Sequence, residues 1–213
     1  MMVQRVLDRR EECLRKHLLQ AKVLEIRVAK RRGNRLRIKL TNEEVSLPAL
    51  ANFAKIETLF GPKVIGNLTY PKRLDLVGRP TLPRRAEAIV IELKAGRLNQ
   101  QDLRQLLGYI TFLRYVQTHG GLVGLQLLSK TLQLRVTRRT RFLGLLIGRS
   151  VSPKLMEWIP EEVWELVRIC RFKVTEGKWP DDLRKIRIYD HGYTFRSERN
   201  RLGKLLHNAL NQS

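Results

Sequence analysis

The feature of this chain that most constrains its fold is a short apolar segment that ends in two opposite charges. Residues 86–96 read AEAIVIELKAG, with Glu92 and Lys94 two residues apart. Such a run predicts a buried strand, and the two-residue period of a strand points both charges to the same side. An unpaired buried carboxylate costs free energy or shifts its pKa, so Glu92 requires a partner, a metal or an open cleft.

A second strand with an internal acid precedes this segment. Residues 73–78 read RLDLVG, in which Asp75 interrupts apolar residues, and Gly78 and Pro80 end the stretch. We therefore expect Asp75 and Glu92 to meet on paired strands.

A helix is predicted directly after the Glu-x-Lys strand. Asn99 is a suitable N-cap, Asp102 is the third helical residue, and apolar residues recur from position 103 to 113 at helical spacing. Gln105 and Tyr109 are four residues apart, so they share one flank of this helix.

An acid, a Glu-x-Lys on the next strand and a helix with Gln and Tyr resemble the PD-(D/E)XK endonuclease superfamily, and within it the NucS-type endonucleases. The segments that carry the resemblance are LDLVG, IVIELKAG and QLLGY, and it covers residues 47–130. It implies an α/β fold with a restriction-endonuclease-like core, in which helices flank a mixed central sheet. It also implies a further acid on a preceding helix, here residues 47–60 with Glu57 as its bearer.

The resemblance implies a metal site and a role for each matching residue. Asp75, Glu92 and the backbone carbonyl of Leu93 would hold Mg²⁺ or Mn²⁺, Glu57 would complete the metal shell, and Lys94 would position water or stabilise the transition state. Gln105 and Tyr109 would orient Lys94 or touch the DNA backbone. Members commonly cut duplex DNA as homodimers, because two strands need two sites.

The spacing of Glu and Lys also occurs in a second place. Glu176-Gly-Lys178 lies in a polar stretch with Gly, Trp and Pro and without a preceding acid-bearing strand, which indicates a loop. Context, and not spacing, separates the two segments.

The charge of the chain indicates a polyanionic partner. The net charge is +22, and residues 47–150 hold 17 Lys and Arg against five acids, three of which are the proposed site residues Glu57, Asp75 and Glu92. This pattern favours a phosphate-binding surface around a metal site. The arginines that follow the Gln/Tyr helix form either a solvated hairpin or a phosphate-binding loop. The expected supporting residues are Arg97, Arg138, Arg139 and Arg141.

The order of predicted elements divides the chain into three segments. Residues 1–46 read as a basic helix and hairpin, and residues 47–150 as the nuclease core. Within that core, residues 122–128, 131–136 and 142–147 are predicted strands. Residues 151–213 are expected to form a helical C-terminal extension, with a helix start at Pro160.

Composition restricts the class of protein. No apolar run reaches the length of a membrane span, and the N-terminus lacks the apolar core of a signal peptide, so we expect an intracellular protein without a membrane partner. Cys13 and Cys170 are isolated, which argues against a zinc site and for a reducing compartment.

Three functions are compatible with these features. The first is a metal-dependent DNA endonuclease that acts on duplex or structured DNA. The second is a basic DNA- or RNA-binding protein that retains the nuclease-like fold without cleaving. The third is a ribosome- or RNA-associated structural protein, in which Glu92 and Lys94 are only an intrastrand pair. The first function requires the site acids and Lys94 to lie within metal-coordination distance of one another, and the second does not.

Overall fold

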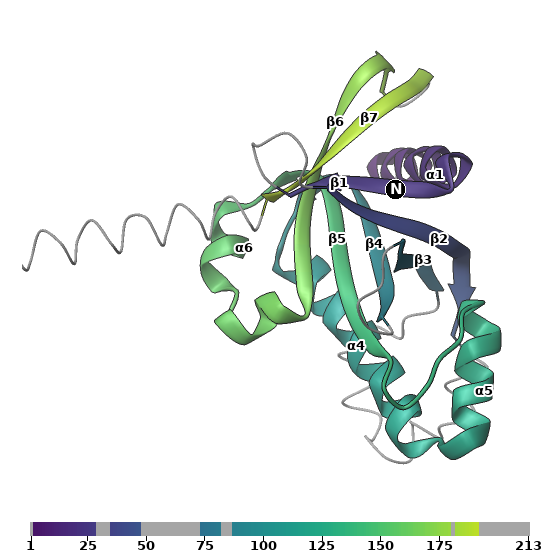
Figure 1. The fold of residues 1–213 in the computed structure, drawn as a ribbon. Helices are drawn as coiled ribbons and strands as arrows, with labels where there is room; N and C mark the ends of the chain where they lie inside the picture. The colour runs from purple at the N-terminus through teal and green to yellow at the C-terminus, as the bar shows by residue number, and fades with distance from the viewer. Residues whose placement is uncertain (1, 29–34, 48–72, 82–86, 180–181, 192–213) are drawn as a thin grey trace, which may run out of the picture.

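A computed structural model describes residues 2–28, 35–47, 73–81, 87–179 and 182–191 (Figure 1). Seven strands close into a barrel in chain order, and the first and last strands pair with each other. The pairs β4–β5, β5–β6 and β1–β7 are parallel, and the other four are antiparallel. The strands are β1 (Val23–Arg27), β2 (Arg35–Ser46), β3 (Arg73–Pro80), β4 (Glu87–Leu98), β5 (Arg141–Val151), β6 (Val167–Lys178) and β7 (Asp182–Asp190).

Helices precede the barrel and connect its parallel strands. The first is α1 (Met2–Ala21), before β1. The crossover from β4 to β5 consists of α4 (Gln100–His119) and α5 (Gly121–Leu132), because parallel neighbours cannot be joined by a tight hairpin. The shorter crossover from β5 to β6 contains α6 (Pro153–Trp158) and the 3₁₀ helix η1 (Glu161–Glu165).

The expected architecture, an open mixed sheet flanked by helices with a helical C-terminal extension, is wrong. The sheet closes on itself, since β7 pairs in parallel with β1 through Ile26↔Ile188 and Arg27↔Tyr189. The expected helical extension instead supplies β6 and β7, which project together beyond the rest of the barrel (Figure 1). The physical reason is the alternation of apolar and charged residues in 167–174, which is a strand pattern.

Three other predicted elements also differ from the structure. Residues 122–128 and 131–136 were predicted as strands. Instead, Gly121–Leu132 is the helix α5, whose buried residues Gly124, Leu128 and Leu132 recur every four positions, and residues 133–136 lie in neither a helix nor a strand. The helix start at Pro160 leads only to the short η1, after which β6 begins at Val167. By contrast, the strand predicted at 142–147 is confirmed as part of β5.

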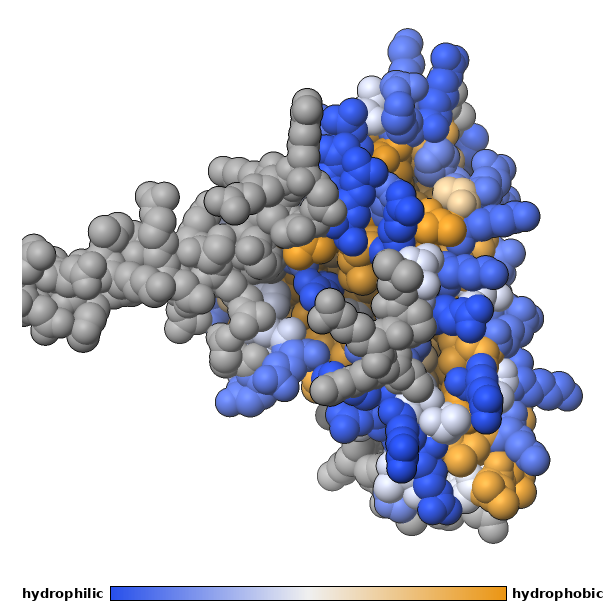
Figure 2. All heavy atoms as spheres, in the orientation of Figure 1, coloured by the Kyte–Doolittle hydropathy of each residue, from blue (hydrophilic) through white to orange (hydrophobic). Residues whose placement is uncertain are grey.

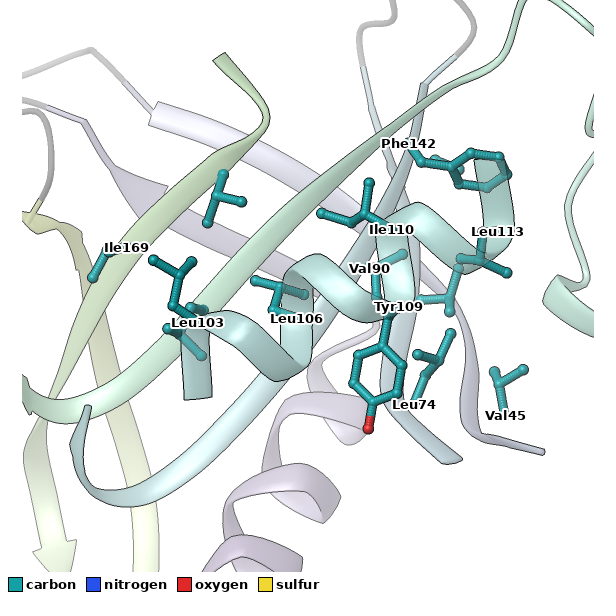
Figure 3. Packing of buried hydrophobic residues seen from close by; sticks show 14 of the residues in the cluster. Val45, Leu74, Val90, Leu103, Leu106, Tyr109, Ile110, Leu113, Phe142 and Ile169 are labelled. Carbon is teal, nitrogen blue, oxygen red and sulfur yellow. The ribbon is translucent and has the colours of Figure 1, made fainter. Parts of the chain in front are cut away.

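Two separate apolar clusters hold the molecule together. The larger one packs α4 and α5 against strands of the barrel, with Leu106, Tyr109 and Ile110 of α4 among its members (Figure 3). The smaller one packs Leu14 and Leu18 of α1 against β1, β4, β5 and β6. Alternate residues of β4 serve the two clusters, so this strand is buried on both faces.

The predicted start of α4 is confirmed. The Asn99 side chain accepts from the amides of Gln101 and Asp102, and the Asp102 carboxylate accepts from the Asn99 amide at 2.8 Å, which forms a capping box. A Cβ on Gly144 of β5 would lie 2.8 Å from Ile110 and 2.9 Å from Leu106. This glycine therefore allows α4 to approach the sheet closely.

The visible surface is largely hydrophilic, with an apolar area over α5 at the lower right (Figure 2). Leu122 and Val123 at the start of α5 are 74% and 60% exposed. None of the helices in the described ranges is both long and apolar enough to cross a membrane.

Candidate functional site

The site forms where β3 and β4 separate. Their register runs from Gly78↔Ile89 to Leu76↔Ile91 and ends there. Beyond this point the amide of Leu93 donates to Asp75 Oδ2 at 2.7 Å. The Asp75 carboxylate thus takes the place of a backbone acceptor on β3. This hydrogen bond holds Asp75 beside the Glu-x-Lys segment.

Glu92 and Lys94 form an ion pair on one face of β4. The distance from Lys94 Nζ to Glu92 Oε1 is 2.8 Å. The Glu92 side chain is 3% exposed and that of Lys94 is 22% exposed. The pair is therefore reached from solvent through the lysine, with the carboxylate beneath it.

The acids affect each other electrostatically. Burial, together with the negative charge of Asp75, raises the pKa of Glu92 to about 8, although Lys94 opposes this shift. Burial also raises the pKa of Asp75, against the stabilising hydrogen bond from the Leu93 amide. Burial disfavours the charge of Lys94, but the attraction and hydrogen bond of Glu92 outweigh it and raise the pKa of Lys94. The cluster holds two carboxylates, Asp75 and Glu92, and one ammonium group, Lys94, so the single positive charge does not balance both acids.

A third carboxylate, Glu11 of α1, was not found from the sequence. Its Oε1 accepts from the amide of Ala95 at 3.2 Å, two residues beyond the amide bound by Asp75, and its charge also raises the pKa of Glu92. Glu11 precedes Leu14 by three residues and Leu18 by seven, so it lies on the helix face that packs against the barrel. The one sequence feature that could have indicated Glu11 is that it is an acid on the apolar face of a helix. Glu57, expected in this role, lies outside the described residues.

Gln105 and Tyr109 support the site from α4. Gln105 Nε2 donates to the Tyr109 hydroxyl at 2.8 Å, and that hydroxyl donates to the carbonyl of Arg73 at 2.9 Å. Tyr109 is packed among apolar side chains (Figure 3), and burial and the charge of Glu92 raise its pKa. These bonds go to the start of β3, two residues before Asp75. They fix that strand to α4.

The expected arginines lie at different distances from the acids. Arg97 is exposed on β4, three residues after Lys94. Arg141 starts β5 opposite Glu87, which is five residues before Glu92, or about 16 Å along the strand. Arg138 and Arg139 are exposed in the turn before it. Of the four arginines, Arg97 is thus the one that follows Lys94 on the same strand, and the other three lie at the far end of the strands.

The donor chemistry of the cluster fits a hard divalent cation. Asp75 and Glu92 offer carboxylate oxygens, and Mg²⁺ is commonly held by one or two carboxylates together with waters and substrate phosphates. Within the described part of the chain, no group of three or more His, Cys, Asp or Glu side chains is arranged to hold a metal ion. Among the described residues, a bound ion would rely on the carboxylates of Asp75 and Glu92, with Glu92 released from Lys94.

The chain was compared with protein-family models, with curated proteins and with solved structures, and none of them matched it. A proposal for the function of the chain therefore rests on the geometry of the site and on the net charge.

Proposed function

We propose that the protein is a metal-dependent endonuclease that hydrolyses phosphodiester bonds in DNA. The observation that carries the proposal is the acid pair of half-buried Asp75 and buried Glu92 beside Lys94, at the separation of β3 and β4. An apolar residue at position 92 would be favoured if the position only stabilised the fold, because a buried carboxylate costs free energy. The net charge of +22 supports a polyanionic substrate.

In such a reaction, the residues of the site would have different roles. Asp75, Glu92 and the carbonyl of Leu93 would hold Mg²⁺ or Mn²⁺, which would lower the pKa of a bound water and neutralise charge on the scissile phosphate. The ammonium of Lys94 stabilises the negative charge that grows on the phosphate oxygens. Glu11 adds negative charge to the cluster and thereby strengthens its affinity for a cation.

Tyr109 and Gln105 act as positioning residues. Through the Arg73 carbonyl they fix the start of β3, and thereby the place from which Asp75 reaches the Leu93 amide. A carboxylate held in place before the substrate arrives needs little rearrangement during the reaction.

A cleavage assay tests the proposal. Linear, mismatched, flapped and four-way DNA is incubated with Mg²⁺ or Mn²⁺ and the wild type, Asp75→Asn, Lys94→Ala or the control Glu176→Gln. We expect metal-dependent cutting by the wild type and the control, and loss of cutting with retained binding in the two site variants. Salt-sensitive binding without cutting of any substrate would instead identify a non-catalytic binding protein.

We further propose that the enzyme cuts duplex DNA as a homodimer, with α5 in the contact between subunits. The exposed Leu122 and Val123 support this contact, because apolar side chains at the centre of an interface lose water on association. Sedimentation velocity is expected to give a dimer for the wild type and a monomer for Leu122→Asp. A monomeric wild type at micromolar concentration contradicts the dimer and leaves the cleavage proposal unaffected.

A further inference from the structure

A pocket of about 630 Å³ lies where β6 and β7 leave the barrel. The last pair between β5 and β6 is Gly148↔Arg171, and the lining residues follow directly after it. This volume is in the range of pockets for small ligands. Its lining includes Arg149, Arg171, Lys173, Phe172, Trp179 and Tyr189.

The lining combines positive charge with aromatic rings. Arg149, Arg171 and Lys173 are exposed. Among the described residues, no acidic side chain lines the pocket, and no carboxylate forms an ion pair with any of the three cations. The guanidinium of Arg171 lies 5.9 Å from the centre of the Tyr189 ring. These groups are thus available to an anionic ligand.

Trp179 adds an unused hydrogen-bond donor. Its ring packs against Phe172 with 5.2 Å between centroids and 53° between planes. Its indole Nε1 is buried, yet it has no hydrogen-bond partner within the described ranges. A buried N–H without an acceptor is unfavourable, so a ligand that brings an acceptor here is favoured.

The strand register connects this pocket with the acid cluster. Lys94 pairs with Gly148, Gly148 with Arg171, and Arg171 with Tyr189, so these residues form one row across four strands. Two strand spacings, about 10 Å, separate the backbones of Lys94 and Arg171. The Leu98 side chain covers Gly148 in the middle of this row, so the register places the pocket near the acid cluster without forming one open groove between them.

We propose that the pocket binds an unpaired nucleotide of a single-stranded nucleic-acid segment. The phosphate contacts Arg149, Arg171 and Lys173, because guanidinium and ammonium groups donate strong hydrogen bonds to phosphate oxygens. The base stacks on Tyr189 or Trp179, and the Trp179 indole donates to an acceptor of the nucleotide. In a duplex the faces of the bases are stacked on their neighbours, so the pocket selects unpaired nucleotides.

This inference concerns binding and stands apart from cleavage. Only its extension, that the proposed nuclease cuts next to a single-stranded segment, rests on the proposed function. The binding test is therefore made without divalent metal, so that its failure and the failure of cleavage are distinguishable.

The test follows the intrinsic tryptophan fluorescence while a thymidine dodecamer, single-stranded or in a duplex with its complement, is added in EDTA. Fluorescence anisotropy of the labelled strand gives the affinity. We expect the single strand to quench fluorescence, Trp179→Phe to remove most of that quenching, and Trp179→Ala to weaken single-strand binding at least about fivefold. Arg171→Ala is expected to weaken it more than Arg138→Ala, which removes the same charge from the far turn.

Four results would overturn the inference: equal weakening by Arg171→Ala and Arg138→Ala, unchanged affinity in Trp179→Ala, equal quenching by duplex and single strand, and full quenching by thymidine monophosphate at the same nucleotide concentration. The last result would assign the pocket to a free nucleotide. Because Trp179→Phe preserves an aromatic ring against Phe172, the quenching comparison remains valid if Trp179→Ala unfolds.

Discussion

Two segments of this chain share the pattern Glu-x-Lys and differ in almost every physical respect. Glu92 and Lys94 pair with each other on β4, and the Glu92 side chain is 3% exposed. Glu176 lies near the end of β6, is 58% exposed and pairs with Lys185 of β7. Burial raises the pKa of Glu92, whereas the hydrogen bond from Lys185 lowers that of Glu176. The surroundings of a motif, and not its spacing, determine its chemistry.

The largest expected difference between the segments is in catalysis. Lys94→Ala should lower the rate of DNA cleavage by roughly two to three orders of magnitude, the usual effect of removing one donor to a developing negative charge. Lys178→Ala changes the same charge at the exposed segment and should leave the rate within about twofold. The measurement is single-turnover cleavage at saturating metal, and equal losses in both variants would mean that only overall charge matters.

The second difference is the sign of the pH dependence of stability. The pKa of Glu92 is about 8 in the folded state, against an ordinary value of 4.5, so the folded state binds the proton more tightly. The contribution of Glu92 is therefore fully present below pH 4.5 and is lost as the pH rises to about 8. The pKa of Glu176 is lowered, so its contribution is present above pH 4.5 and is lost as the pH falls.

Urea unfolding in EDTA between pH 5 and pH 8 measures this difference. The unfolding free energy of the wild type, measured relative to that of Glu92→Gln, should fall by roughly 1 kcal/mol for each unit by which the pH rises. Glu176→Gln should show the wild-type slope over this range. Parallel curves for the wild type and Glu92→Gln would show that Glu92 has an ordinary pKa.

The third difference concerns the loss of a basic partner. Lys94→Met keeps the apolar stem of the lysine but leaves the Glu92 carboxylate unpaired. We expect a loss of about 2 kcal/mol in unfolding free energy at pH 9 and a smaller loss at pH 5, where Glu92 is protonated. Lys185→Met removes the partner of Glu176 and should leave the urea midpoint unchanged, because exposed ion pairs contribute little.

The smallest expected difference lies in the supporting hydroxyl groups. Tyr109→Phe removes the donor to the Arg73 carbonyl and should cost about 1 kcal/mol in unfolding free energy. Thr175→Val removes an exposed bond to the Lys185 carbonyl near the second segment and should cost less. Thermal unfolding of both variants measures the difference, and an equal or larger cost for Thr175→Val would contradict the supporting role of Tyr109.

The strands near the acids and the helix after them were predictable from local pattern. The apolar run around Glu92, the Asp75 stretch and the Asn99 cap each contain their own signal within a few residues, and the structure has β3, β4 and α4 in these positions. The contact between Asp75 and the β4 segment follows from the pairing of two neighbouring strands.

The closure of the barrel was not predictable in the same way, because it depends on residues far apart in the chain. The strand at 167–174 was missed because the helix-start signals at Pro160 led us to expect a helix there. The strand prediction for 122–128 failed because an apolar run of that length fits a strand or a helix face equally well. Glu11 was missed because an acid on the apolar face of α1 does not by itself indicate that α1 packs against β4.

The seam between β1 and β7 has a consequence for the order of folding. It joins Ile26 to Ile188 and Arg27 to Tyr189, so a loop of about 160 residues must close before these pairs form. Long-range pairs of this kind form late, because the loss of chain entropy precedes the gain from contact. The carboxylates from Glu11 to Glu92 lie in the first half of the chain, so a nascent chain can assemble their framework while the ring is still open. We expect closure of the seam to be the last and slowest step of folding.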